Sequence, residues 1–279
     1  MKELISAQEL SDRLDDDRLI VLDASLHLPA TGRDAHAEYA AAHIPEARFL
    51  DLATLTDPAG SAPNAVPTRA QFAERLAQLG ISAGDRVGLY DDSVLRSSAR
   101  AWFVFKLHGW QDVAILDGGL RAWRSSGLPL DSGTPHWERS SLSEADLSAT
   151  GASLRDKEQV RANVRSGAEQ VVDARDEARF RGEEGSGSAG HIPGALNVPF
   201  TRMLDDDGRF RSGDAVRAEL QAAGVDADRP IITSCNSGVT ACVVLFAARM
   251  AGARQLALYD GSWVEWGNDP STPKASGAA

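Results

Sequence analysis

The chain repeats itself over a long distance, and this repetition limits the possible folds more than any other feature. Three blocks return in the same order, at offsets of 150, 148 and 143 residues. The pairs are LIVLDA with QVVDA (19–24 and 170–174), AAHIPEARFLDL with AGHIPGALNVPF (41–52 and 189–200), and LHGWQDVAILDGGLRAW with MAGARQLALYDGSWVEW (107–123 and 250–266). Solenoid repeats recur every ~20–50 residues, so this much longer period predicts two globular copies of one domain. We expect the first copy over residues 1–130, a linker over 131–154 and the second copy over 155–279.

Each copy alternates short apolar strands with amphipathic helices. In the first copy, TRAQFAERLAQLG (68–80) places Phe72, Leu76 and Leu79 on one helical face and stops at Gly80. The strand RVGLY, the helix SARAWFVFKLHG and the strand VAIL follow. This alternation predicts an α/β fold in each copy, a mostly parallel sheet with helices on both faces. The stretch 131–154 is polar with few large apolar residues, as expected for a linker.

Composition and charge exclude several classes of protein. No run approaches 18 apolar residues and the N-terminus lacks an apolar signal region, so we expect neither a membrane span nor a secretory signal. The net charge is −11 and no Lys/Arg cluster stands out, so nucleic acid is not an expected partner. Two cysteines do not make a disulfide framework, which indicates a reducing cytoplasm. Cys235 and Cys242 show no CxxC spacing and no neighbouring histidine, so we expect no metal site.

Cys235 lies where a strand gives way to a helix, in PIITSCNSGVTACVVLFAARMAG. Ligands bind at the carboxyl edge of a parallel sheet, and a short loop that opens a helix turns backbone N–H groups inward as an anion nest. A cysteine in such a nest is expected to be largely thiolate at neutral pH. Gly238 permits the tight backbone, and Ser237 and Thr240 add hydroxyl donors. Cys242 lies on an apolar helix face, where we expect it to pack in the core.

Two chemistries use a thiolate in a nest. A phosphatase places an arginine six residues after the cysteine, but Ala241 stands there. The other chemistry is sulfur transfer, in which the thiolate takes a sulfane sulfur, becomes a persulfide and passes the sulfur to an acceptor. In the first copy Asp91 or Asp92 stands where the cysteine should be, so that copy is expected to be catalytically silent.

The sequence resembles the tandem-domain rhodanese family, the thiosulfate and mercaptopyruvate sulfurtransferases. The matching features are the two HIP blocks, VVDAR (171–175), RFRG (179–182), CNSGVTA (235–241) and YDGSWVEW (259–266). The resemblance implies two rhodanese folds, an inactive first domain and an active second one, with Cys235 as the nucleophile. It also implies that Arg179 binds the donor's anionic group, while the persulfide is cradled by Asn236, Ser237, Gly238, Val239 and Thr240. No cofactor is expected. The implied partners are a small-molecule sulfur donor and a thiol acceptor, such as thioredoxin or a small thiol.

The residues that follow Cys235 indicate which sulfur donor is used. The thiosulfate branch carries basic residues directly after the cysteine, whereas CNSGVT is nearer the mercaptopyruvate branch, which favours 3-mercaptopyruvate. Other positions depart from that branch: Asn64 replaces its interdomain histidine, Ala53 replaces an acidic residue, and its second substrate arginine is absent before His191. The alternatives are a thiosulfate:cyanide sulfurtransferase and a non-catalytic rhodanese-like binding module. The intact Cys235 argues against the module.

Overall fold

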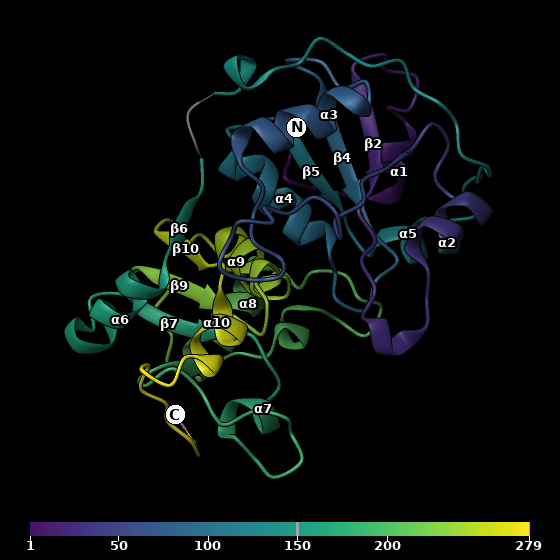
Figure 1. Cartoon of the computed structure of the whole chain (residues 1–279). Helices are drawn as coiled ribbons and strands as arrows, with labels where there is room; N and C mark the ends of the chain where they lie inside the picture. The colour runs from purple at the N-terminus through teal and green to yellow at the C-terminus, as the bar shows by residue number, and fades with distance from the viewer. Residues whose placement is uncertain (149–150, 279) are drawn as a thin grey trace. The chain divides into compact units, whose positions relative to one another are not determined.

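The computed structural model describes residues 1–148 and 151–278. The chain divides into two compact units. Figure 1 colours the chain continuously by residue number. The first unit comprises Met1–Asp57 and Val66–Gly151, and the second comprises Pro58–Ala65 and Ala152–Ala279. A short segment of the first half of the chain is therefore grouped with the second unit.

Each unit contains one five-stranded sheet, and the two sheets have the same strand order. In the first unit the order is β1-β5-β4-β2-β3, formed by Leu4–Ile5 (β1), Leu19–Asp23 (β2), Arg48–Phe49 (β3), Arg86–Tyr90 (β4) and Val113–Leu116 (β5). In the second unit the order is β6-β10-β9-β7-β8, formed by Ser153–Arg155 (β6), Gln170–Asp173 (β7), Leu196–Asn197 (β8), Ile231–Ser234 (β9) and Leu256–Tyr259 (β10). All the pairings between these strands are parallel. The predicted α/β fold with a mostly parallel sheet in each copy is confirmed.

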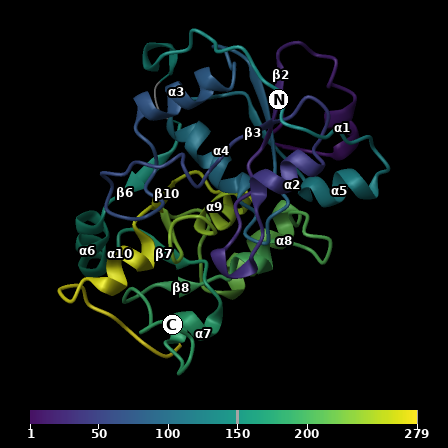
Figure 2. The same cartoon turned by 45° about the vertical axis from the view of Figure 1, so that its right-hand side comes forward.

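Helices cover both faces of each sheet (Figures 1 and 2). The first unit contains α1 (Ala7–Ser11), α2 (Ala35–Ala41), α3 (Arg69–Gln78), α4 (Ser98–Leu107) and α5 (Gly119–Ser125). The second contains α6 (Lys157–Ser166), α7 (Glu177–Arg181), α8 (Gly213–Ala222), α9 (Ala241–Met250) and α10 (Ser262–Asn268). Short 3-10 helices occur at Pro29–Thr31 (η1), Glu144–Asp146 (η2) and Phe200–Met203 (η3). On one face of the first sheet, α1, α2 and α5 form a core around Tyr39, Tyr90 and Trp123, while α4 packs on β4 and β5.

Residues at the two ends of α3 explain where this helix begins and ends. Thr68 caps the helix in a capping box with Gln71, which satisfies free N–H groups of the first turn. Phe72 and Leu76 face the core and are fully buried. At Gly80 the backbone has φ +68°, and a Cβ atom would lie 2.6 Å from the carbonyl oxygen of Glu138. The predicted stop at this glycine is therefore explained by both conformation and close packing.

The stretch expected to be a linker packs closely onto the first unit. The Ser140 N–H donates to the Ala77 carbonyl oxygen at 2.9 Å, and the Arg69 guanidinium donates to the carbonyl oxygens of Leu147 and Ser148. Strand β6 begins at Ser153, inside the expected linker. Residues 149–150 of that stretch, and residue 279 at the end of the second copy, lie outside the described residues.

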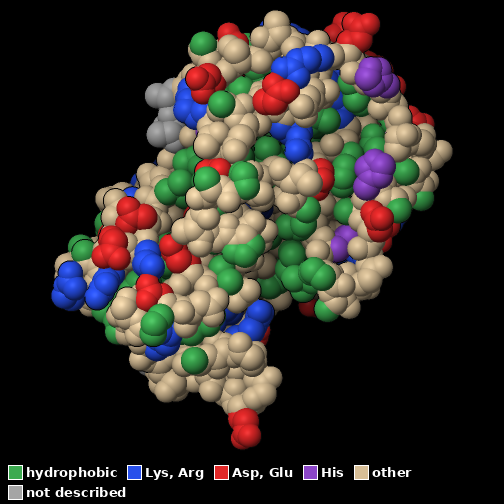
Figure 3. All heavy atoms as spheres, viewed as in Figure 1, with side chains coloured by type: hydrophobic (Ala, Val, Ile, Leu, Met, Phe, Trp, Pro, Cys, Tyr) green, Lys and Arg blue, Asp and Glu red, His purple; other side chains and the backbone are tan. Residues whose placement is uncertain are grey.

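Two surface properties bear on the expected partners. In the described ranges, no helix reaches the length and apolarity that crossing a bilayer requires. On the face drawn in Figure 3, basic and acidic side chains are interspersed, and the described residues on that face form no continuous basic stripe.

Candidate active site

Cys235 lies at the carboxyl end of β9, the middle strand of the second sheet, directly after Ser234. The residue is 2% exposed. The loop 235–240 connects β9 to α9, which begins at Ala241. The topology thus places this thiol at the edge of a parallel sheet where ligands bind.

The loop after Cys235 presents several unpaired backbone donors. Gly238 has φ +78°, a conformation that L side chains rarely adopt, and this glycine permits the turn. Within the described part of the chain, no acceptor is found for the N–H groups of Asn236, Ser237, Val239 and Thr240. The N-terminus of α9 adds a partial positive charge beside them. Such a loop favours a bound anion, and this is the chemistry predicted for the nest.

Contacts from α10 hold the cysteine loop in place. The Cys235 N–H donates to the Ser262 Oγ at 3.2 Å, and the Ser262 hydroxyl donates to the Tyr259 carbonyl oxygen at 2.8 Å. The Trp263 N–H donates to the Cys235 carbonyl oxygen at 3.0 Å, and the Val264 N–H donates to that of Asn236 at 2.9 Å. The block YDGSWVEW was recognised in the sequence, but its contact with the cysteine was not predicted.

Ser262 adopts a strained backbone conformation. Its φ is +50° and its side chain is fully buried. At the equivalent place in the first unit stands Gly119, with φ +59°. The first copy has DGG where the second copy has DGS, and this difference in the sequence indicates a special role for the serine. A serine in the left-handed region needs a compensating contact, which a glycine does not.

A buried ion pair lies beside the cysteine strand. Asp173 ends β7 and is paired in register with Ser234. Its carboxylate accepts from the Arg175 Nη2 at 2.6 Å and from the Arg175 Nε at 3.0 Å. The guanidinium also lies over the Trp263 ring, 4.5 Å from its centroid. A fully buried guanidinium needs such partners, so Arg175 is a structural neighbour of the loop that was not assigned to the site from the sequence.

Arg179 lies on α7 with a half-exposed side chain. Its Nε donates to the carboxylate of Asp176, the N-cap residue of the same helix. The contacts among the described residues do not connect it with the Cys235 loop. Cys242, by contrast, is fully buried in α9, and its Sγ donates to the Gly238 carbonyl oxygen at 3.2 Å.

In the first unit, Asp91 takes the place of the cysteine. The Leu120 N–H donates to the Asp91 carbonyl oxygen at 3.0 Å, as that of Trp263 does to Cys235. The carboxylate accepts from the N–H groups of Ser93 at 2.9 Å and Ser98 at 3.0 Å. Burial raises the pKa of Asp91, against the effect of these hydrogen bonds. The first unit therefore has a carboxyl group at this place and no thiol.

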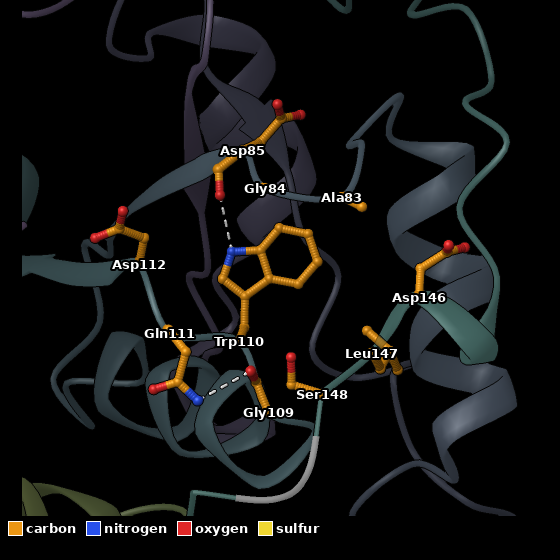
Figure 4. A pocket seen from close by; sticks show the side chains of 10 residues that line it. All are labelled: Ala83, Gly84, Asp85, Gly109, Trp110, Gln111, Asp112, Asp146, Leu147 and Ser148. Atoms are coloured by element: carbon orange, nitrogen blue, oxygen red, sulfur yellow. Dashed lines mark hydrogen bonds between the residues drawn. The ribbon is translucent and has the colours of Figure 1, made fainter.

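A pocket of the first unit lies away from these sites (Figure 4). It is lined by Asp85 and Asp112, which precede β4 and β5, and by Trp110, whose Nε1 donates to the Asp85 carbonyl oxygen at 3.1 Å. It therefore lies at the amino edge of the sheet, opposite the edge that carries Asp91. Nowhere in the described ranges do three or more His, Cys, Asp or Glu side chains gather as a metal site.

The rhodanese-like domain family matches residues 6–126 and 156–269. The chain belongs to the rhodanese family. The human 3-mercaptopyruvate sulfurtransferase is 39% identical over 277 residues, which cover 95% of this chain and 92% of that protein. The bovine thiosulfate sulfurtransferase is 38% identical over 255 residues, covering 89% and 84%.

Rhodanese architecture is also found among solved structures. The crystal structure of SseA from Escherichia coli, described as a 3-mercaptopyruvate sulfotransferase with the rhodanese fold, matches with a TM-score of 0.85 and 33% identity. The match covers 94% of this chain and 99% of that one. The predicted family, fold and sulfurtransferase class are confirmed by these relatives.

Proposed function

We propose that this rhodanese moves sulfane sulfur from a small anionic donor to a thiol acceptor through a persulfide on Cys235. The observation that carries the proposal is the loop 235–240. A single buried thiol lies at the carboxyl edge of the sheet, and four backbone N–H groups of its loop have no acceptor among the described residues. These donors stabilise the thiolate before transfer and the persulfide anion after it.

The proposed reaction proceeds in two displacements. With 3-mercaptopyruvate, the Cys235 thiolate attacks the donor sulfur and an S–S bond forms. The C–S bond breaks, its electron pair leaves as the enolate of pyruvate, and the donor thiol proton passes to the enolate carbon. The enzyme is left with a persulfide anion. An acceptor thiolate, from thioredoxin or a small thiol, then attacks the outer sulfur and releases the Cys235 thiolate.

For the donor, we propose 3-mercaptopyruvate before thiosulfate. The first two residues after Cys235, Asn236 and Ser237, are uncharged, so the loop lacks the cations that a doubly charged donor needs. Overall identity does not separate the two donors, since relatives of both names match almost equally well. Steady-state rates with thiosulfate and with 3-mercaptopyruvate compare them directly. A higher kcat/KM for thiosulfate would reverse the assignment.

We further propose Arg179 as the donor's anchor and the first unit as a catalytically silent copy. The proposal for Arg179 rests on its place in the RFRG motif, and the proposal for the first unit rests on the carboxylate of Asp91.

We also propose that the protein works in a reducing compartment such as the cytoplasm. Both cysteines are free thiols, which supports this proposal.

The test of the reaction is the persulfide itself. After incubation with the donor and removal of excess, mass spectrometry should show the addition of one sulfur atom, roughly 32 Da, on the Cys235 peptide. Cys235→Ser should show neither the addition nor turnover. Cys242→Ser is the matched control and should keep most activity, since that thiol packs inside α9. Turnover by Cys235→Ser would remove the mechanism, and a protein with no added sulfur would be a non-catalytic module.

A further inference from the structure

The backbone makes the same turn after β2 in the first unit and after β7 in the second unit. The Ser25 N–H donates to the Asp23 carboxylate at 2.9 Å, as the Arg175 N–H does to Asp173 at 3.0 Å. The N–H of Ala24 bonds to the Tyr90 carbonyl oxygen at 2.8 Å, and Ala174 makes the equivalent bond to Ser234, also at 2.8 Å. Asp23 and Asp173 are therefore equivalent buried carboxyl groups.

Of these two carboxyl groups, only that of Asp173 is paired with a cationic side chain among the described residues. In the second unit the guanidinium of Arg175 lies between the Asp173 carboxylate and the Trp263 ring. In the first unit the position of that arginine is taken by Ser25, and the position of the tryptophan by Leu120. Within the described ranges no Lys, Arg or His forms an ion pair with Asp23, which is 2% exposed. The first unit therefore has the buried carboxyl group without the arginine and the tryptophan that lie beside it in the second unit.

A hollow of about 220 Å³ lies beside Asp23, Ser25 and Leu120, the equivalents of Asp173, Arg175 and Trp263. Asp23, Ser25, Tyr39, Ala42 and Leu120 line it. It lies between α2 and α5, which are side by side in both views (Figures 1 and 2). The volume is below the ~300–1,000 Å³ that is usual for drug-sized ligands, so only a small group fits.

The charged residues around this hollow do not neutralise Asp23. Arg33 donates to both carboxylate oxygens of Glu38, at 2.8 and 2.6 Å, and to the carbonyl oxygen of Asp92 at 3.0 Å. Arg124 pairs with the Asp92 carboxylate at 3.6 Å. Arg33 and Arg124 both line the hollow, and their hydrogen bonds and ion pairs go to Glu38 and Asp92. Neither arginine pairs with Asp23, the third carboxyl group that lines the hollow.

Charge is reversed between the two units at a second position. Tyr39 stacks on His43, whose Nδ1 lies 2.8 Å from the Tyr39 carbonyl oxygen, and Phe180 and His191 repeat this arrangement. The residue before Tyr39 is Glu38, whereas the residue before Phe180 is Arg179. At this position the second unit therefore has an arginine, and the first unit has a carboxylate.

We propose that this hollow of the first unit is a binding site for a small guanidinium cation, which enters where the side chain of Arg175 lies in the second unit. The planar guanidinium makes two parallel hydrogen bonds to a carboxylate, a geometry that an ammonium group does not reproduce. Binding adds a cationic partner to the buried Asp23 carboxylate, which within the protein accepts hydrogen bonds from Ser25 and Tyr90. The guanidinium group belongs either to a small molecule or to the side chain of an arginine in another protein.

The test is a titration of the full chain with methylguanidinium chloride at pH 8, followed by amide NMR. The resonances of Ser25 and Asp92 should shift, with a Kd on the order of 1 mM, as expected for one buried ion pair on a very small ligand. Methylammonium should bind at least roughly fivefold more weakly, because it lacks the planar pair of donors. Equal affinity for the two cations would overturn the assignment.

Two variants and a control locate the site. Asp23→Asn should weaken methylguanidinium binding at least roughly tenfold, since it removes the charge and keeps the shape. Ser25→Arg should abolish binding by filling the hollow with the protein's own guanidinium. Glu74→Gln, which removes an exposed carboxylate of α3 outside the hollow, should bind like the wild type. Wild-type affinity in both Asp23→Asn and Ser25→Arg would rule the site out.

A comparison of ligands separates the two sources of the guanidinium group. If a Gly-Arg-Gly peptide binds tenfold tighter than methylguanidinium in the same titration, the site serves an arginine side chain of a protein. If the free cation binds as well or better, the site serves a small molecule. If neither causes shifts that Ser25→Arg removes, the proposal fails.

Discussion

Two aspartates at equivalent strand ends, Asp23 and Asp173, show how one neighbouring residue determines the behaviour of a buried carboxyl group. Asp173 is held by Arg175. Burial raises the pKa of Asp23 from 3.8 to about 6, against hydrogen bonds from Ser25 and Tyr90 that favour its charged form. The folded protein therefore holds this proton to higher pH than the unfolded chain does. Between about pH 4 and pH 6 the folded form binds more protons, so the Asp23 contribution to stability falls as the pH rises.

This difference predicts opposite effects for one substitution at the two positions. At pH 8, Asp23→Asn should raise the free energy of unfolding by about 1–2 kcal/mol, because it removes an unpaired buried charge, and at pH 4 the gain should vanish. Asp173→Asn should instead lower it by about 3–5 kcal/mol, because it leaves the Arg175 guanidinium buried without its charge partner. Urea unfolding at both pH values measures the two effects. Destabilisation of Asp23→Asn at pH 8 would contradict the assignment of an unpaired charge.

Arg179 is the residue on which the proposed donor site depends most. Because its side chain is half-exposed and bound to Asp176, we expect Arg179→Ala to lower kcat/KM for anionic donors by roughly tenfold, mainly through KM. Alkylation of Cys235 by neutral iodoacetamide should be unchanged, since the loop is left intact. Arg181→Ala, which removes an exposed arginine paired with Glu177 on the same helix, is the control. An unchanged KM in Arg179→Ala would place the anchor elsewhere.

At the scale of elements, the junction of β9, its loop and α10 positions Cys235, the proposed nucleophile. Ser262 supplies the acceptor for the Cys235 N–H while its own backbone remains in the left-handed region. That conformation costs a non-glycine residue on the order of 1–2 kcal/mol. The Ser262 hydroxyl makes two hydrogen bonds, which offset part of this strain.

Two variants of Ser262 separate strain from hydrogen bonding. Ser262→Ala keeps the strain and loses both hydrogen bonds, so it should lower both kcat/KM, by roughly tenfold, and stability. Ser262→Gly loses the same hydrogen bonds but relieves the strain, so it should be about 1 kcal/mol more stable than Ser262→Ala with a similar loss of kcat/KM. Thermal unfolding and steady-state kinetics measure the two effects. Equal stability of the two variants would show that the backbone is not strained there.

At the scale of the whole molecule, each unit has its own sheet and its own hydrophobic core. Phe72 of α3 packs edge-on against Phe105 of α4, with ring centroids 5.0 Å apart. Phe246 of α9 packs against Phe210 in the second unit, with centroids 4.8 Å apart. All the named strand pairs stay within one unit, so local unfolding is expected to follow the units.

Matched core truncations test this independence. Phe72→Ala should destabilise the first unit by about 3–5 kcal/mol, and Phe246→Ala should do the same in the second. Hydrogen exchange measured by mass spectrometry should show lost protection mainly within the unit that carries the substitution. Equal loss of protection in both units for either variant would show that they unfold as one.

The sequence by itself determined the duplication, the alternation of strands and helices, and the cysteine at a strand end. Those features are carried by local patterns of apolar residues, glycines and repeated blocks. Tertiary structure decided which aspartate replaces the cysteine, since Asp91 and Asp92 are adjacent in sequence and the Leu120 N–H donates to the Asp91 carbonyl oxygen. It also joined Ser262 to Cys235 and enclosed Arg175, while a hollow was left beside Asp23. These features depend on how residues distant in the chain pack together, and no local pattern encodes that packing.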